Sequence, residues 1–109
     1  MDNAATVVSL RALAHQHRLA AYRALVQAGP AGLAVGELRG PLGLAPATLT
    51  AHLNVLRSAG LVGDEREGRV IRVRVDFERM HALIGFLTEN CCAGASCAPT
   101  ARPRKRTGR

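Results

Sequence analysis

Aromatic side chains are scarce in this sequence of 109 residues, which has no tryptophan, one tyrosine and two phenylalanines. Single-strand nucleic-acid platforms stack bases on aromatic rings, so the composition argues against that class. No apolar run approaches the roughly 20 residues of a membrane-spanning helix, and no basic segment with a continuous apolar core opens the chain. We therefore expect a cytoplasmic protein without a membrane partner.

Cysteine is also rare, and the three cysteines, Cys91, Cys92 and Cys97, lie within seven residues. Neighbouring residues have Cα atoms about 3.8 Å apart, below the usual disulfide range, so a Cys91–Cys92 bond would be strained. A Cys92–Cys97 bond is sterically possible but leaves an odd thiol. The pattern therefore argues against a disulfide scaffold.

Basic residues outnumber acidic ones, and the formal net charge is +7. Five of the fifteen basic residues lie in 102–109, so residues 1–101 carry only +2. Such a tail suggests contact with a polyanion, the alternative being a solvated, disordered end. The length and the 48% hydrophobic content suit one domain with a modest core, which dimerisation could complete.

The segment 45–62 predicts a short helix, with Pro46 suited to its first position and Gly60 to its end. A helical stripe of leucines, Leu49, Leu53 and Leu56, faces a core. The opposite face is small and polar, comprising Ala47, Thr50, Ala51, Asn54 and Ser58. Threonine and asparagine can bond base edges, so the DNA major groove is a candidate partner. The alternative is a plain amphipathic helix.

The rest of the chain predicts a helix-turn-helix followed by a hairpin. We expect helices at 3–15, 17–28 and 35–42, with a turn at Gly43 before the helix already described. Strands at 61–66 and 69–75 flank Glu67-Gly68, with Ile71, Val73 and Val75 on a buried face. Arg66 and Arg69 at the hairpin tip could reach DNA phosphates, or could simply solubilise the edge.

A last helix follows Asp76, a good N-cap. Its wide apolar stripe could form a dimer contact or pack on the first helix, and comprises Phe77, Met80, Leu83, Ile84 and Leu87. The cysteines come where this helix ends, where the helix dipole disfavours a thiolate, which counts against a thiol enzyme. Three sulfurs joined by a flexible loop could converge on one soft ion, or form an unliganded, oxidisable tail.

From about Leu10 to Glu89 the sequence resembles the ArsR/SmtB family of bacterial winged-helix repressors. The resemblance lies in ALAHQHRLAAYRALVQAG, VGELRGPLGLAPATLTAHLNVLRSAGLV and REGRVIRVRV, and is strongest in the run His52 to Val62. It implies a homodimer paired through the first and last helices, which binds double-stranded operator DNA and leaves it when an inducer binds. The DNA-reading positions it implies are Ala47, Thr48, Thr50, Ala51 and Asn54, whereas His52 matches a position that usually packs.

Two departures bear on the inducer. The helix before the recognition helix, ELRGPLG, has none of the cysteines of the best-known arsenic sensors, and Asp76, His81 and Glu89 are a thin set for a zinc sensor. The CC-x4-C cluster instead resembles arsenic repressors whose three thiolates follow the last helix. The resemblance thus implies that arsenite, or antimonite, binds Cys91, Cys92 and Cys97 within each subunit, with no cofactor required.

The sequence therefore predicts a mostly α, homodimeric winged helix-turn-helix fold of order α-α-α-α-β-β-α. We expect a DNA-binding and dimerisation domain at 1–90, a cysteine-bearing inducer site at 91–98 and a basic, disordered tail at 99–109. The predicted function is an arsenic-responsive repressor involved in arsenic resistance, and not an enzyme. The alternative is a sensor of zinc, cadmium or thiol oxidation through the same cysteines, with His81 or a tail group as a fourth metal ligand. A thiol-dependent metalloid reductase and a nucleoid-type DNA-coating protein are further alternatives.

Overall fold

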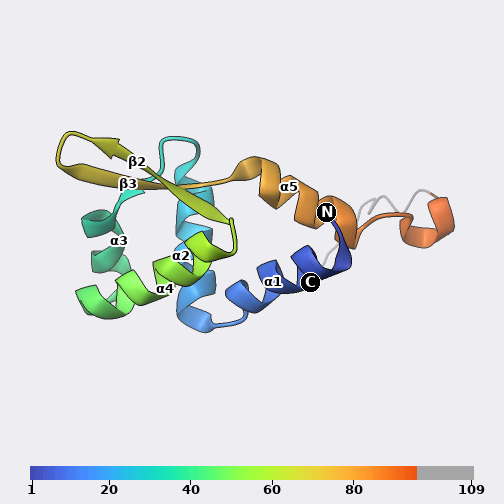
Figure 1. Cartoon of the computed structure of the whole chain (residues 1–109), viewed down its shortest axis with the longest axis horizontal. Helices are drawn as coiled ribbons and strands as arrows, with labels where there is room; N and C mark the ends of the chain where they lie inside the picture. Colours follow the sequence, from blue (N-terminus) through green and yellow to red (C-terminus); the bar gives the residue numbers. More distant parts are fainter. Residues whose placement is uncertain (96–109) are drawn as a thin grey trace, which may run out of the picture.

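The computed structural model describes residues 1–95, which form five α-helices, a three-stranded sheet and a short 3-10 turn. The hairpin projects at one end of the molecule, while α1 and α5 lie together toward the other (Figure 1). The arrangement is a winged helix-turn-helix, as predicted from the sequence. No helix among these residues is both long and apolar enough to cross a membrane. The elements are α1 (Asn3–Leu13), α2 (Gln16–Ala28), β1 (Leu33–Ala34), α3 (Val35–Leu42), α4 (Pro46–Ser58), β2 (Val62–Glu67), β3 (Val70–Val75), α5 (Phe77–Leu87) and η1 (Cys91–Gly94).

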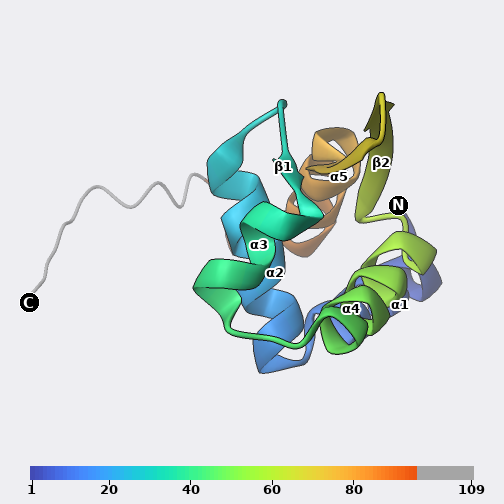
Figure 2. The ribbon, with the colours of Figure 1, turned by 90° about the vertical axis from the view of Figure 1, so that its left-hand side faces the viewer.

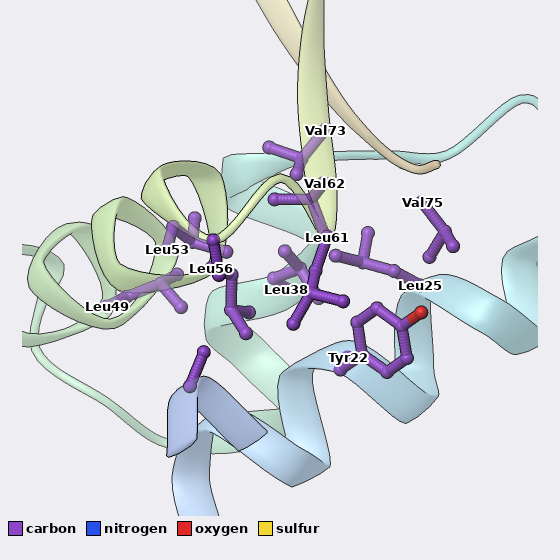
Figure 3. Close-up of a cluster of buried hydrophobic side chains, with 12 residues drawn as sticks. Tyr22, Leu25, Leu38, Leu49, Leu53, Leu56, Leu61, Val62, Val73 and Val75 are labelled. Carbon is purple, nitrogen blue, oxygen red and sulfur yellow. The ribbon is translucent and has the colours of Figure 1, made fainter. Parts of the chain in front are cut away.

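The core is built around one face of α4. Its stripe, Leu49, Leu53 and Leu56, is at most 1% exposed, which confirms the predicted orientation of the helix. These side chains point toward Leu38 of α3 and Leu61, which follows α4 (Figure 3). Burying each leucine contributes about 1.5–3 kcal/mol, so the stripe fixes which face α4 leaves to solvent.

The junction between α1 and α2 differs from the predicted one, because α1 ends at Leu13 rather than at His15. His15 has an extended backbone and is the N-cap of α2, where its Nδ1 accepts the backbone N–H of His17 at 3.1 Å. Arg18 then reaches back, and its Nε donates to the carbonyl oxygen of Ala12 at 2.6 Å. Side chains therefore bond to the backbone at both helix ends where α1 meets α2.

The sheet has the order β1-β3-β2, and β1 is a strand that the sequence patterns did not predict. It is two residues long and pairs antiparallel with β3 through Leu33 opposite Val73 and Ala34 opposite Arg72. Gly32, just before it, has φ +68°, and a Cβ there would lie 2.2 Å from the carbonyl oxygen of Val73. Only glycine allows this close approach of the two backbones.

The hairpin confirms the predicted alternation, since Val73 and Val75 are buried and Ile71 is half-buried. The turn lies at 68–69 rather than at 67–68, because β2 runs one residue further than expected. Beyond Val62, every residue of β2 is exposed. The wing is therefore a thin ribbon that is anchored to the core at its base.

Asp76 caps α5 as predicted, and its carboxylate accepts the backbone N–H of Arg79 at 3.0 Å. Of the apolar stripe on α5, only Leu83 is buried, while Ile84 and Leu87 are 50% and 56% exposed. The helix does pack on α1 of the same chain, which is one of the two expected outcomes. That contact still leaves apolar surface uncovered on both helices, and on α1 it comprises Val7, Val8 and Leu10.

Candidate nucleic-acid interface and thiol cluster

The outer face of α4 carries all five predicted DNA-reading residues, and every one of them is exposed: Ala47, Thr48, Thr50, Ala51 and Asn54. The leucine stripe on the opposite side holds them in this orientation. Figure 2 views the molecule from the wing end, with α4 in front of α1 and the hairpin above α4. Small side chains on this face would let the α4 backbone approach the floor of a major groove closely.

One member of this face, Asn54, is oriented by its neighbours. Its Oδ1 accepts Nη1 of Arg57 at 2.8 Å, and Nε of Arg57 bonds Oδ1 of Asp64 at 3.0 Å. Asp64 lies in β2, so this chain links the recognition helix to the wing. With its amide oxygen bonded to Arg57, Asn54 keeps its NH2 group as a donor, which suits acceptors such as purine N7.

The four arginines of the hairpin fall into two groups. Arg72 donates to the carbonyl oxygens of Ala31 and Gly32 at 3.0 and 3.1 Å, so it fastens the wing to the turn before β1. Arg74 pairs with Glu65 across the strands at 3.2 Å. In the part of the chain that the structure describes, Arg66 and Arg69 form no ion pair and both are exposed. The two predicted phosphate contacts are thus the hairpin arginines left available.

Two of the three predicted inducer ligands lie in η1, just beyond α5. Sγ of Cys91 contacts Sγ of Cys92 at 3.6 Å, so the pair stands as thiols rather than as a disulfide. The segment is wound the wrong way for an ordinary helix, because Asn90, Cys92 and Ala93 have φ of 55°, 57° and 56°. Left-handed conformations cost roughly 1–2 kcal/mol for each residue that has a Cβ. The thiols therefore sit on a strained turn.

Among residues 1–95 no three histidine, cysteine or acidic side chains gather closely enough to hold a metal ion. Cys97, the third predicted ligand, lies outside the described residues, as does the basic tail at 99–109. Of the residues considered for a zinc site, Asp76 caps α5 and His81 is exposed on it.

The contacts that orient α4 and the wing were not predicted from the sequence. Arg57, Asp64 and Arg72 all take part in them. An arginine alternating with valines signalled that Arg72 lies on the outer face of the strand. That alternation does not show that the side chain of Arg72 turns back toward the residues that precede β1.

A helix-turn-helix with an exposed, small, polar second helix and a wing tipped by available arginines defines a winged-helix DNA-binding protein. Sequence comparison agrees, because residues 13–63 match the model of a family described as a helix-turn-helix domain. The biofilm growth-associated repressor of Agrobacterium fabrum is 37% identical over 95 residues, which are 85% of this chain and 79% of that protein.

Solved structures give the same result. An ArsR-like transcriptional regulator from Rhodococcus sp. RHA1 superposes with a TM-score of 0.70 at 25% identity, covering 84% of this chain and 82% of that one. A homodimeric winged helix-turn-helix DNA-binding domain from Mycobacterium bovis, a possible ArsR-family regulator, has a TM-score of 0.62 at 28% identity, covering 84% of each chain. The chain belongs to the ArsR family of winged-helix transcriptional regulators. The relatives are regulators, which confirms the expectation of a regulator rather than an enzyme.

Proposed function

We propose that this protein is a homodimeric repressor that releases its operator when trivalent arsenic, as arsenite, or antimonite binds Cys91, Cys92 and Cys97. The observation that carries the proposal is the placement of two thiols side by side at the end of α5, 3.6 Å apart. Two sulfurs bound to one soft ion at about 2.3 Å would lie roughly 3.3–3.8 Å apart, for bond angles between those of a pyramidal and a tetrahedral site. The spacing of the pair therefore suits a shared soft ion, and Cys97, five residues on, would complete a three-sulfur set.

The proposed coupling to DNA runs through α5. The thiols begin within four residues of its last helical residue, Leu87, and α5 packs on α1. The strain in the left-handed residues around Cys92 would be released or redistributed when an ion draws the sulfurs together. A change at the end of α5 would then alter the position of the helices that we assign to the dimer interface.

The proposed dimer interface is the uncovered apolar surface of α1 and α5. Val8 of α1 and Ile84 of α5 are each 50% exposed, on two helices that are already in contact. A second copy would remove this surface from water, and the homodimeric relative from Mycobacterium bovis supports the same arrangement. The recognition residues on α4 and the tip arginines, Arg66 and Arg69, would then meet operator DNA in two symmetric copies.

Arsenite titration into a protein–DNA complex tests the sensing proposal. The duplex is one selected from random sequences by the protein without inducer. We expect arsenite to weaken binding by about 5- to 150-fold, the usual range of allosteric coupling. A small dithiol in excess should restore it. If the variant with all three cysteines changed to serine still binds the duplex and is released by arsenite like the wild type, the assignment is wrong.

The same assay separates the alternative of a zinc, cadmium or redox sensor. The adjacent thiols also suit these signals, because zinc and cadmium accept thiolates and neighbouring thiols oxidise readily. Release by zinc or cadmium at lower concentrations than arsenite, abolished by His81→Gln, would favour a four-coordinate metal site. Release by peroxide alone, reversed by dithiothreitol, would favour a redox sensor.

A further inference from the structure

Three histidines that lie far apart in the sequence meet beside the recognition helix. The ring of His52 on α4 lies 4.5 Å from that of His15 and 5.8 Å from that of His17, measured between centroids. The rings of His15 and His17 are 5.5 Å apart. We call these three residues the histidine cluster. It fills the point where the turn between α1 and α2 touches α4.

The cluster borders the face that we assign to DNA. His52 directly follows Ala51, which belongs to that face, and His15 is exposed. Arg18, whose charge acts on His52, lines a hollow of about 440 Å³ between α1 and α4 together with Asn54 of the DNA-reading face. A duplex held against the outer face of α4 would therefore bring backbone phosphates near the cluster.

The surroundings of the cluster are cationic. Partial burial lowers the pKa of His52 below its ordinary value, and the charges of His15, Arg18 and His17 lower it further. These are the charged groups that act on His52 from α2 and the preceding turn, and within residues 1–95 no carboxylate is among them. The described part of the free protein thus offers no anion to a protonated His52. An anion from outside the protein would supply the negative charge that is missing beside these histidines.

The hydrogen bonding of His15 argues against reading the cluster as a metal site. Its Nδ1 accepts a backbone N–H at the start of α2, so the neutral ring carries its hydrogen on Nε2. A metal bound at Nε2 would need that hydrogen on Nδ1, and the cap of α2 would be lost. Within the described part of the chain, the three rings accordingly form no metal-binding group.

We propose that His52 and His17 of the histidine cluster make a proton-dependent contact to DNA phosphate while His15 keeps its cap at the start of α2, so that the protein takes up protons as it binds DNA. The inference rests on the assignment of the outer face of α4 to DNA, and it is independent of arsenic. Since histidine titrates between about pH 5 and 8, binding should strengthen as the pH falls across this interval. A bound phosphate that raises one histidine pKa by one unit strengthens binding about tenfold at low pH.

The test measures affinity for the selected duplex at pH 8.0 and 6.0, without arsenite, in EDTA and at constant ionic strength. We expect the wild type to bind several-fold more tightly at pH 6.0, short of the full tenfold because the pKa of His52 is lowered in the free protein. His52→Gln should lose most of this gain while matching the wild type at pH 8.0. His81→Gln, on α5 away from the cluster, is the matched control and should keep the full gain.

A second variant protects the test against misfolding. His17→Gln leaves the cap at His15 intact and should lose part of the gain, with circular dichroism and melting temperature checked for each protein. An unchanged gain in His52→Gln and in His17→Gln would overturn the proposal, as would a wild type whose affinity is the same at both pH values. If the effect of His52 appears only with added zinc and disappears in EDTA, the cluster is a metal site and the proton proposal fails.

Two further variants distinguish a failure of the assignment of α4 to DNA from a failure of the histidine proposal. Thr50→Ala and Ala51→Glu should weaken binding at both pH values if α4 reads DNA. If these two variants bind normally, the outer face of α4 is not the DNA surface, and any pH dependence has another origin. If they weaken binding but the pH gain is absent, only the role of the histidine cluster is refuted.

Discussion

The two ends of this molecule differ in how far their apolar side chains are buried and in whether their backbone is strained. Around α4, leucines that are almost fully buried hold an outer face of small polar side chains, and arginine contacts join that face to the wing. Around the end of α5, apolar side chains stand in solvent and the cysteines occupy a strained turn. The first region buries its leucines within one chain. The second exposes apolar side chains that a partner could cover, and it holds residues in a strained backbone conformation. The contrast suggests that the first reads DNA as a rigid body and that the second changes when partners bind.

The same substitution, leucine to alanine, gives the sharpest test of this contrast. Leu53→Ala opens a cavity in the core and should lower the free energy of unfolding by about 2–5 kcal/mol. Leu87→Ala, at a side chain that is 56% exposed, should change it far less but should weaken dimerisation. Urea denaturation and sedimentation at several protein concentrations measure the two effects. A large loss of monomer stability in Leu87→Ala would show that the two ends are not built differently.

The tip of the wing should behave as a phosphate contact rather than as a base reader. Arg69→Gln is expected to weaken binding to the selected duplex and to unrelated duplexes alike, and to reduce the slope of log K against log salt by roughly 0.9. Arg74→Gln is the matched control, because Arg74 is held by Glu65. Fluorescence anisotropy at a series of salt concentrations measures both. Loss of binding to the selected duplex alone would contradict the assigned role.

Tyr22 reports on the junction between the two regions, and it is the sole tyrosine of the chain. Its hydroxyl is buried without a hydrogen-bond partner in the described structure, and burial, with Asp76 adding a smaller effect, raises the pKa of Tyr22 above 10.0. The folded state therefore favours the neutral phenol. The contribution of Tyr22 to stability should be fully present below the pKa of tyrosine in the unfolded chain. It should be lost as the pH rises through the pKa of Tyr22 in the folded protein.

Ultraviolet absorbance near 295 nm should follow this titration directly, with a midpoint above that of free tyrosine. Tyr22→Phe removes a buried hydroxyl that has no partner, so it should be neutral or slightly stabilising at pH 7 and should reduce the loss at high pH. A midpoint at or below 10 would mean that the junction is open to water, and that α5 is loosely attached to the reading domain.

The order of the elements was predictable because local signals agreed with the tertiary structure. The leucine stripe of α4, Pro46 at its start and Asp76 before α5 each act within a few residues. The strand β1 was not predictable, because two residues are too few to show a period and they pair with β3 some forty positions away. The sequence predicts an end of α1 that is two residues too late, because a histidine N-cap has no strong sequence signature.

The candidate site was predictable only in part, for the same reason. Periodicity shows which residues of α4 face outward, and the tip arginines follow from the hairpin turn. Nothing local shows that Arg57 orients Asn54 or that His15 and His52 meet, because these contacts depend on how α2, α4 and the wing pack. The sequence can locate the cysteines but not the distance between their sulfurs, which the backbone of η1 sets.

The outer edge of the wing has a consequence for how this protein behaves at high concentration. β2 is the longer of the two edge strands of the sheet, and an exposed edge strand can recruit a strand from another molecule and start aggregation. Here that edge reads Asp64, Glu65, Arg66 and Glu67 in succession. A second copy lying alongside in parallel register would bring like charges together at every position. The charges of β2 therefore disfavour the parallel, in-register stacking of wings that would build a fibril.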